Sequence, residues 1–215
     1  MKKNLSLLFC LLVPAALYAQ DCTRFIYLQK GKTIETTTFT AAGDVIAKRT
    51  NHILDVSTAN GITTATAEVE NFDRAGRSSG KNTVTYKCDG GTFYFDMSAM
   101  GADKVKMSAS NMEFPAGMKV GDHLKDMDIK MHVARPGTPG RDMSIKITNV
   151  QVVAKESVTT PAGTWDALKI TYETKMDMPG MNMPSQITTE WFVPNFGIVQ
   201  WELGRGLSMK ITAIH

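Results

Sequence analysis

The sequence has few of the residues on which enzyme chemistry usually depends. Its 215 residues include three cysteines and four histidines. No Cys-x-x-Cys, His-x-His or His-Glu-x-x-His spacing occurs, so the common short zinc and redox motifs are missing. The formal charge is only +3 and the basic residues are scattered. Composition therefore gives no reason to expect a nucleic-acid partner.

Catalytic constellations are also missing, apart from one match by letter. Residues 76–80 read Gly-Arg-Ser-Ser-Gly, which fits the Gly-x-Ser-x-Gly pattern of a nucleophile elbow. That elbow needs a sharp turn from a strand into a helix, whereas residues 82–88 have the pattern of a strand. Acidic residues show no pairing suited to acid–base catalysis, and we expect a protein that is not an enzyme.

Long apolar runs are confined to the N-terminus. Lys2 and Lys3 precede an apolar run from Leu5 to Leu17, and polarity rises at Asp21. This is the pattern of a secretory signal peptide, residues 1–19, with cleavage after Ala19 or Gln20. The run is too short to span a bilayer, and we predict no transmembrane segment. An exported protein of the periplasm or cell envelope is expected, with an extracellular location also open.

Cleavage would leave two cysteines, Cys22 and Cys88. In an oxidising compartment, two cysteines favour one disulfide. Two free thiols are the alternative, and a lipid on Cys22 is a further one, although Asp21 is not the small residue that a lipidation site needs. A Cys22–Cys88 disulfide would close a loop of roughly 67 residues and contribute about 4 kcal/mol in the chain-entropy model.

The rest of the chain has the pattern of strands and turns. Short runs rich in Thr, Val, Ile, Phe and Tyr alternate with Gly, Asn, Asp and Pro, and helical periodicity is confined to 96–104. Asn60-Gly61 is the strongest hairpin signal. The predicted strands are 24–30, 32–40, 45–56, 61–72, 82–88, 92–97, 129–134, 143–157, 165–176, 186–193, 198–203 and 207–214.

These strands predict an all-β fold: a curved antiparallel sheet, as a half-barrel, open barrel or sandwich, of about ten to twelve strands with meander connections and little helix. We expect a single β domain over 20–215, with a possible sub-boundary near residue 115. Trp165, Tyr172, Trp191 and Trp201 fall on neighbouring predicted strands and are expected in the core. An exposed aromatic shelf for sugar stacking is the alternative.

Methionine is the one unusual enrichment, with 14 in the chain. Met176, Met178, Met181 and Met183 lie in a segment whose Pro and Gly residues predict the tip of a β-hairpin. Thioethers are soft ligands that select Cu(I), so these four residues are a candidate copper site. Methionine also fills adaptable apolar surfaces, and the same residues are compatible with a pliable groove for an apolar ligand. No cofactor other than copper is considered.

Several turn and core motifs together resemble a known family. They are Gly31-Lys32, Glu35-Thr36, Phe39, Ala42-Gly43, Cys88-Asp89-Gly90-Gly91, Asp96-Met97, Phe114-Pro115, Val120-Gly121-Asp122, Glu156, Thr160-Pro161-Ala162-Gly163-Thr164-Trp165, Lys169-Ile170, Glu190-Trp191-Phe192-Val193-Pro194 and Gly197-Ile198-Val199. This set is similar to the TapB-like exported proteins, a group related to domain of unknown function 3108. The resemblance implies a curved antiparallel sheet in the envelope of Gram-negative bacteria, similar in shape to lipoprotein carriers that hold acyl chains. It implies no catalytic residues.

Three functions follow as hypotheses. The first is a non-enzymatic envelope protein that binds an apolar or amphipathic ligand, or a lipidated partner, in the concave face of the sheet. The second is a structural or protein-interaction domain that holds another envelope protein. The third is a Met-rich Cu(I)-binding protein. The identity of the ligand and the oligomeric state are left open by the sequence.

Overall fold

The computed structural model describes residues 22–96, 105–107, 111–135, 138–178 and 180–215. Two short 3₁₀ helices, η1 (Cys22–Arg24) and η2 (Ile26–Leu28), precede the strands. The described strands are β1 (Thr33–Phe39), β2 (Val45–Ala59), β3 (Ile62–Asp73), β4 (Ser78–Asp89), β5 (Thr92–Asp96), β6 (Val105–Met107), β7 (Asn111–Phe114), β8 (Met127–Arg135), β9 (Thr138–Thr160), β10 (Gly163–Met178), β11 (Met181–Asn182), β12 (Gln186–Val193), β13 (Gly197–Glu202) and β14 (Ser208–Ile214).

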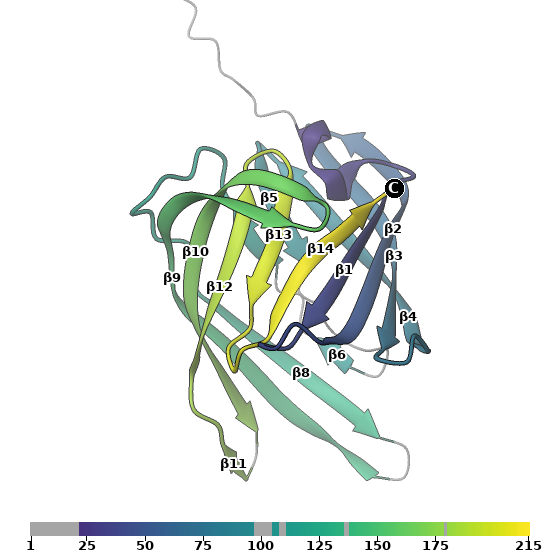
Figure 1. Cartoon of the computed structure of the whole chain (residues 1–215), viewed down its shortest axis with the longest axis vertical. Coiled ribbons are helices and arrows are strands. Elements are labelled where there is room, and N and C mark those ends of the chain that lie inside the picture. The colour runs from purple at the N-terminus through teal and green to yellow at the C-terminus, as the bar shows by residue number, and fades with distance from the viewer. Residues whose placement is uncertain (1–21, 97–104, 108–110, 136–137, 179) are drawn as a thin grey trace, which may run out of the picture.

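All of these strands belong to one antiparallel sheet that curls into a nearly closed, barrel-like shape (Figure 1). The order is β6-β8-β9-β10-β12-β13-β14-β1-β2-β3-β4-β5-β7, with β11 paired to β10. Most neighbours in the sheet are also neighbours in sequence, as expected for short hairpin connections. The pairing of β14 with β1 joins the last strand to the first. The prediction of a curved antiparallel all-β fold is confirmed.

Most predicted strands are confirmed within a few residues of their ends, and 186–193 matches β12 at both ends. The Asn60-Gly61 hairpin is confirmed as well. Asn60 has φ 52° and Gly61 has φ 78°, which are the two positive values that a type I′ turn needs. The positive φ at Asn60 costs little free energy, because asparagine tolerates the left-handed region better than most residues that have a side chain.

The predicted strand 24–30 is wrong. This segment contains η1 and η2, which lie across one end of the sheet (Figure 1, purple). Four consecutive residues, Phe25 to Leu28, are all at least 95% buried, so no alternation of buried and exposed side chains exists. A short, continuous apolar run cannot be assigned to a strand by periodicity alone, because it also fits a segment buried on every side.

The two 3₁₀ helices, residues 22–28, form an N-terminal plug that supplies the centre of the aromatic core. The Phe25 ring stacks on Phe93 with centroids 4.7 Å apart, and Tyr27 lies 5.0 Å from Tyr86. The backbone N–H of Ile26 donates to the Phe196 carbonyl at 3.0 Å. Burial of four large apolar side chains, worth about 1.5–3 kcal/mol each, holds the plug against the strands.

Further differences concern short elements. The predicted strand 82–88 is longer in the structure, because β4 already begins at Ser78. β6, β7 and β11 were not predicted, and each has four residues or fewer, too few for a recognisable alternation. The possible helical turn at 96–104 lies outside the described residues, apart from Asp96 at the end of β5. The signal peptide and its cleavage site also lie outside them.

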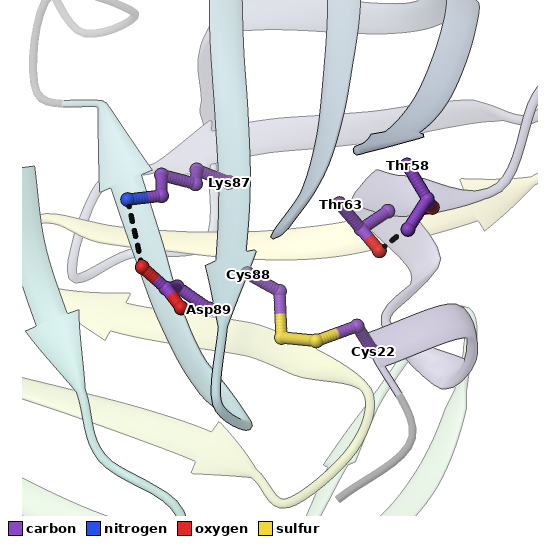
Figure 2. The surroundings of a disulfide bond; sticks show 6 residues. All are labelled: Cys22, Thr58, Thr63, Lys87, Cys88 and Asp89. Atoms are coloured by element: carbon purple, nitrogen blue, oxygen red, sulfur yellow. Dashed lines mark hydrogen bonds and ion pairs between the residues drawn. A yellow bond between two sulfur atoms is a disulfide. The ribbon is translucent and has the colours of Figure 1, made fainter. Parts of the chain in front are cut away.

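The predicted Cys22–Cys88 disulfide is present, with 66 residues of sequence separation and Cα atoms 5.7 Å apart (Figure 2). It joins η1 to the end of β4, where Cys88 is fully buried. The disulfide therefore anchors the plug at one end of the sheet.

In the described ranges, no helix is long and apolar enough to cross a bilayer.

Candidate functional site

An apolar cavity of about 290 Å³ lies inside the curved sheet. Its closed end is formed by Phe95 of β5, Ile147 of β9, and Ile198 and Trp201 of β13, all at least 95% buried. β5 and β13 are far apart in the strand order, yet the Phe95 and Trp201 rings are 6.2 Å apart. The cavity is therefore enclosed by the curvature of the sheet and is not a groove on its outer face.

The cavity opens toward the β10–β11 hairpin. Along β10, the side chains facing the cavity change from the buried Tyr172 to the half-buried Thr174 and Met176. Half-buried Met183 and exposed Pro184 complete this edge of the wall. Methionine and proline thus border the entrance, and flexible thioether side chains suit apolar guests of variable shape.

One acidic group lies in the wall of this apolar space. Glu190, in the middle of β12, is 0% exposed and faces the cavity together with Gln186 and Thr188, its neighbours at alternate positions. The Tyr172 hydroxyl donates to Glu190 Oε2 at 3.3 Å. Oε1 is buried and has no hydrogen-bond partner within the described part of the chain. Such an unsatisfied buried oxygen is costly, about 1–3 kcal/mol, and calls for a functional explanation.

Burial raises the pKa of the Glu190 carboxyl to about 8, because an ion is poorly solvated in an apolar cavity. The Tyr172 hydroxyl and the nearby Trp201 indole both favour the ionised carboxylate, but they oppose the shift only in part. Burial also raises the pKa of the Tyr172 phenol, and the adjacent carboxyl adds to that effect. At neutral pH both groups are therefore mainly uncharged, and the whole cavity wall is neutral.

Sequence reasoning missed Glu190 as a functional residue. Alternation along the strand 186–193 puts Gln186, Thr188 and Glu190 on one face, with Ile187 and Trp191 on the other. Polar faces of strands are usually solvated, so the sequence alone gives no reason to expect that Glu190 is buried. The structure reverses this: Glu190 is buried, whereas Ile187 is 60% exposed on the outer face. The sequence contained one signal for a buried polar group at Glu190. This strand has a polar face, although other strands already supply a well-defined apolar core.

The methionine hairpin is formed, and its register places Met178 directly opposite Met181. Met176 and Met183 contribute to the cavity wall. The copper hypothesis for these four residues stays a prediction, since backbone register alone does not place thioether sulfurs around an ion. Among the described residues, no group of three or more His, Cys, Asp or Glu side chains could hold a metal ion.

The Gly-x-Ser-x-Gly match does not form a nucleophile elbow. Gly76 has φ 77° in the turn after β3, and Ser78 and Ser79 are exposed residues at the start of β4. The turn joins two antiparallel strands, whereas the elbow requires a strand followed by a helix. The aromatic residues behave as predicted for a core: Tyr172, Trp191 and Trp201 are at most 6% exposed, and Trp165 is half-buried against Phe196.

A nearly closed antiparallel sheet around an internal apolar cavity, with two short 3₁₀ helices across one end, defines the class of this all-β protein. The chain belongs to the DUF3108-like family, whose model matches residues 29–203. This match confirms the family resemblance found in the turn and core motifs. A comparison with curated proteins gives no match.

Two solved structures share the fold. One, from Bacteroides fragilis NCTC 9343, is regarded as an exported protein with a YmcC-like fold; it is 20% identical, with a TM-score of 0.74 over 89% of this chain and 98% of that chain. The other, from Parabacteroides distasonis ATCC 8503, is regarded as a lipoprotein; it is 19% identical, with a TM-score of 0.77 over 91% of this chain and 100% of that one. At these identities, the likeness concerns the fold.

Proposed function

We propose that this protein is a non-enzymatic, exported protein of the cell envelope that binds an apolar or amphipathic ligand inside its curved sheet. The observation that carries the proposal is the apolar cavity of about 290 Å³ with one buried carboxyl in its wall. Small-molecule sites have this character: mainly apolar walls, a few polar groups, and volumes of roughly 300–1,000 Å³.

The other observations agree with an envelope location. The Cys22–Cys88 disulfide is of the kind that persists in oxidising compartments. The two structural neighbours are regarded as an exported protein and a lipoprotein. In this structure the sulfur of Cys22 is bonded to Cys88, which is incompatible with a thioether-linked lipid on the same atom. We therefore propose that the protein receives its ligand within the cavity and carries no lipid on Cys22.

Filling the cavity should abolish binding. Thr174 faces the cavity from β10, and its hydroxyl oxygen lies 3.2 Å from that of Thr188. In the variant Thr174→Trp the indole would occupy the space that the guest needs. We expect the purified wild type to enhance the fluorescence of the neutral apolar probe N-phenyl-1-naphthylamine, with at least a tenfold loss of affinity in the variant.

Ile187→Trp is the matched control, because Ile187 lies on the outer face of β12, next to two cavity-facing residues. It adds an indole of the same size without entering the cavity, and its affinity should equal that of the wild type. Met176→Trp is a second blocking variant if Thr174→Trp unfolds, as judged by thermal unfolding. Equal probe binding by the wild type and by a folded blocking variant would place the probe elsewhere and refute the proposed site.

A further inference from the structure

The carboxyl of Glu190 has the position of a recognition group for the polar part of the ligand. It lies in the deep, buried portion of the cavity, whereas the hydroxyls of Thr174 and Thr188, nearer the entrance, already pair with each other. One oxygen of Glu190 accepts from Tyr172, and the other has no partner in the described residues. Rotation about the last side-chain bond of glutamate is soft, so either oxygen can turn toward a guest.

We propose that the cavity selects an uncharged amphiphile that carries an acceptor oxygen, such as an ester carbonyl, and that protonated Glu190 donates a hydrogen bond to this oxygen. This inference rests on the proposed function, since it names the class of ligand that the same cavity takes.

Two features of the wall favour an uncharged guest. Of the residues lining the cavity, only Glu190 and Tyr172 titrate, and neither is cationic. β5, β7, β9 and β13 contribute apolar or aromatic side chains to it, including Phe95, Met112 and Ile147. A buried anion would therefore lack a counter-ion, which is strongly unfavourable in an apolar space.

Arg49, a half-buried cation of β2, is not among the residues that line this cavity. Its Nε donates to Asn71 Oδ1 at 2.9 Å, and its charge acts on Tyr27 and Tyr86. Arg49 therefore interacts with residues of η2, β3 and β4, and its side chain is not in the wall beside Glu190.

The protonation state of Glu190 determines whether the ligand must accept or donate the hydrogen bond between them. Because Oε2 accepts from Tyr172, the carboxyl proton belongs on Oε1, the oxygen without a partner. Burial keeps this proton in place at neutral pH, since it raises the pKa to about 8. The group then presents a donor to the guest, and a matching acceptor oxygen satisfies it.

The test compares three ligands of equal chain length by displacement of N-phenyl-1-naphthylamine at pH 6.5: methyl decanoate, decanoate and decylamine. We expect the neutral ester to displace the probe at a concentration at least tenfold lower than the anion or the cation. Glu190→Gln keeps a donor and should retain ester affinity, whereas Glu190→Met removes it and should weaken the ester about tenfold, the effect of one buried hydrogen bond.

The pH gives a second readout. For the wild type, ester affinity should fall as pH rises past about 8, because Glu190 then loses the donated proton, and it should stay constant for Glu190→Gln. Preference for decanoate or decylamine, or equal ester affinity in wild type and Glu190→Met, would overturn the inference and leave the cavity as a nonspecific apolar site. Failure of the probe itself to bind would instead refute the proposed function.

Discussion

Replacing Glu190 by Gln should remove a large part of the pH dependence of stability between pH 5 and pH 8. The folded-state pKa of Glu190 is about 8, raised from the ordinary value of 4.5 mainly by burial. Between these values the folded protein holds a proton that the unfolded chain has lost. The free energy of unfolding therefore falls as pH rises, by at most about 1.4 kcal/mol per pH unit, and the contribution is complete only below the unfolded pKa.

Denaturant unfolding at pH 5 and pH 8 measures this effect. Relative to the wild type, Glu190→Gln should gain about 3 kcal/mol in unfolding free energy on going from pH 5 to pH 8. Glu202→Gln, which changes an exposed carboxyl of the adjacent β13, is the matched control and should follow the wild type. Parallel pH profiles for wild type and Glu190→Gln would show that Glu190 is ionised in the fold and would contradict the neutral cavity.

Loss of the Cys22–Cys88 disulfide should be the most damaging single covalent change. The bond closes a loop with 66 residues of sequence separation and fixes the plug at the end of β4. In the chain-entropy model its removal lowers the free energy of unfolding by about 4 kcal/mol, a large part of the roughly 5–15 kcal/mol typical of a domain. The plug also carries Phe25 and Tyr27, so its release would expose the aromatic core.

The Cys22→Ser, Cys88→Ser double variant should show this loss in denaturant unfolding under oxidising conditions. Adding a reducing agent to the wild type should lower its midpoint to that of the double variant, and the same addition should leave the double variant unchanged. An unaltered midpoint in the double variant would mean that the packing of Phe25 and Tyr27 holds the plug without the covalent bond.

Sequence reasoning predicted most of the fold, because the fold depends on local signals. Alternating apolar residues and turn chemistry at positions such as Asn60-Gly61 define the strands and their hairpins, and the chain order of the hairpins largely defines the sheet. The plug was assigned wrongly since its burial depends on distant strands: Phe25 meets Phe93 and Phe192 only after the sheet has curled. Local periodicity contains no information about such contacts.

The site was harder to predict, for a related reason. The methionines that border the cavity, Met176 and Met183, were recognised as unusual, and a pliable apolar groove was one interpretation. Glu190 was missed because alternation separates the two faces of a strand without saying which face is buried. Closure of the sheet puts the polar face of β12 inside, and the pKa of Glu190 follows from that closure.

Native mass spectrometry of the protein, purified gently from the cells that produce it, tests the proposed ligand cavity most directly. We expect an added mass that denaturation releases as an uncharged amphiphile, present in Ile187→Trp and missing in Thr174→Trp. Copper mass increments lost with Met178→Leu and Met181→Leu would support the methionine hairpin as a metal site instead. A bare polypeptide mass in the wild type would contradict a resident ligand and leave an interaction domain as the better account.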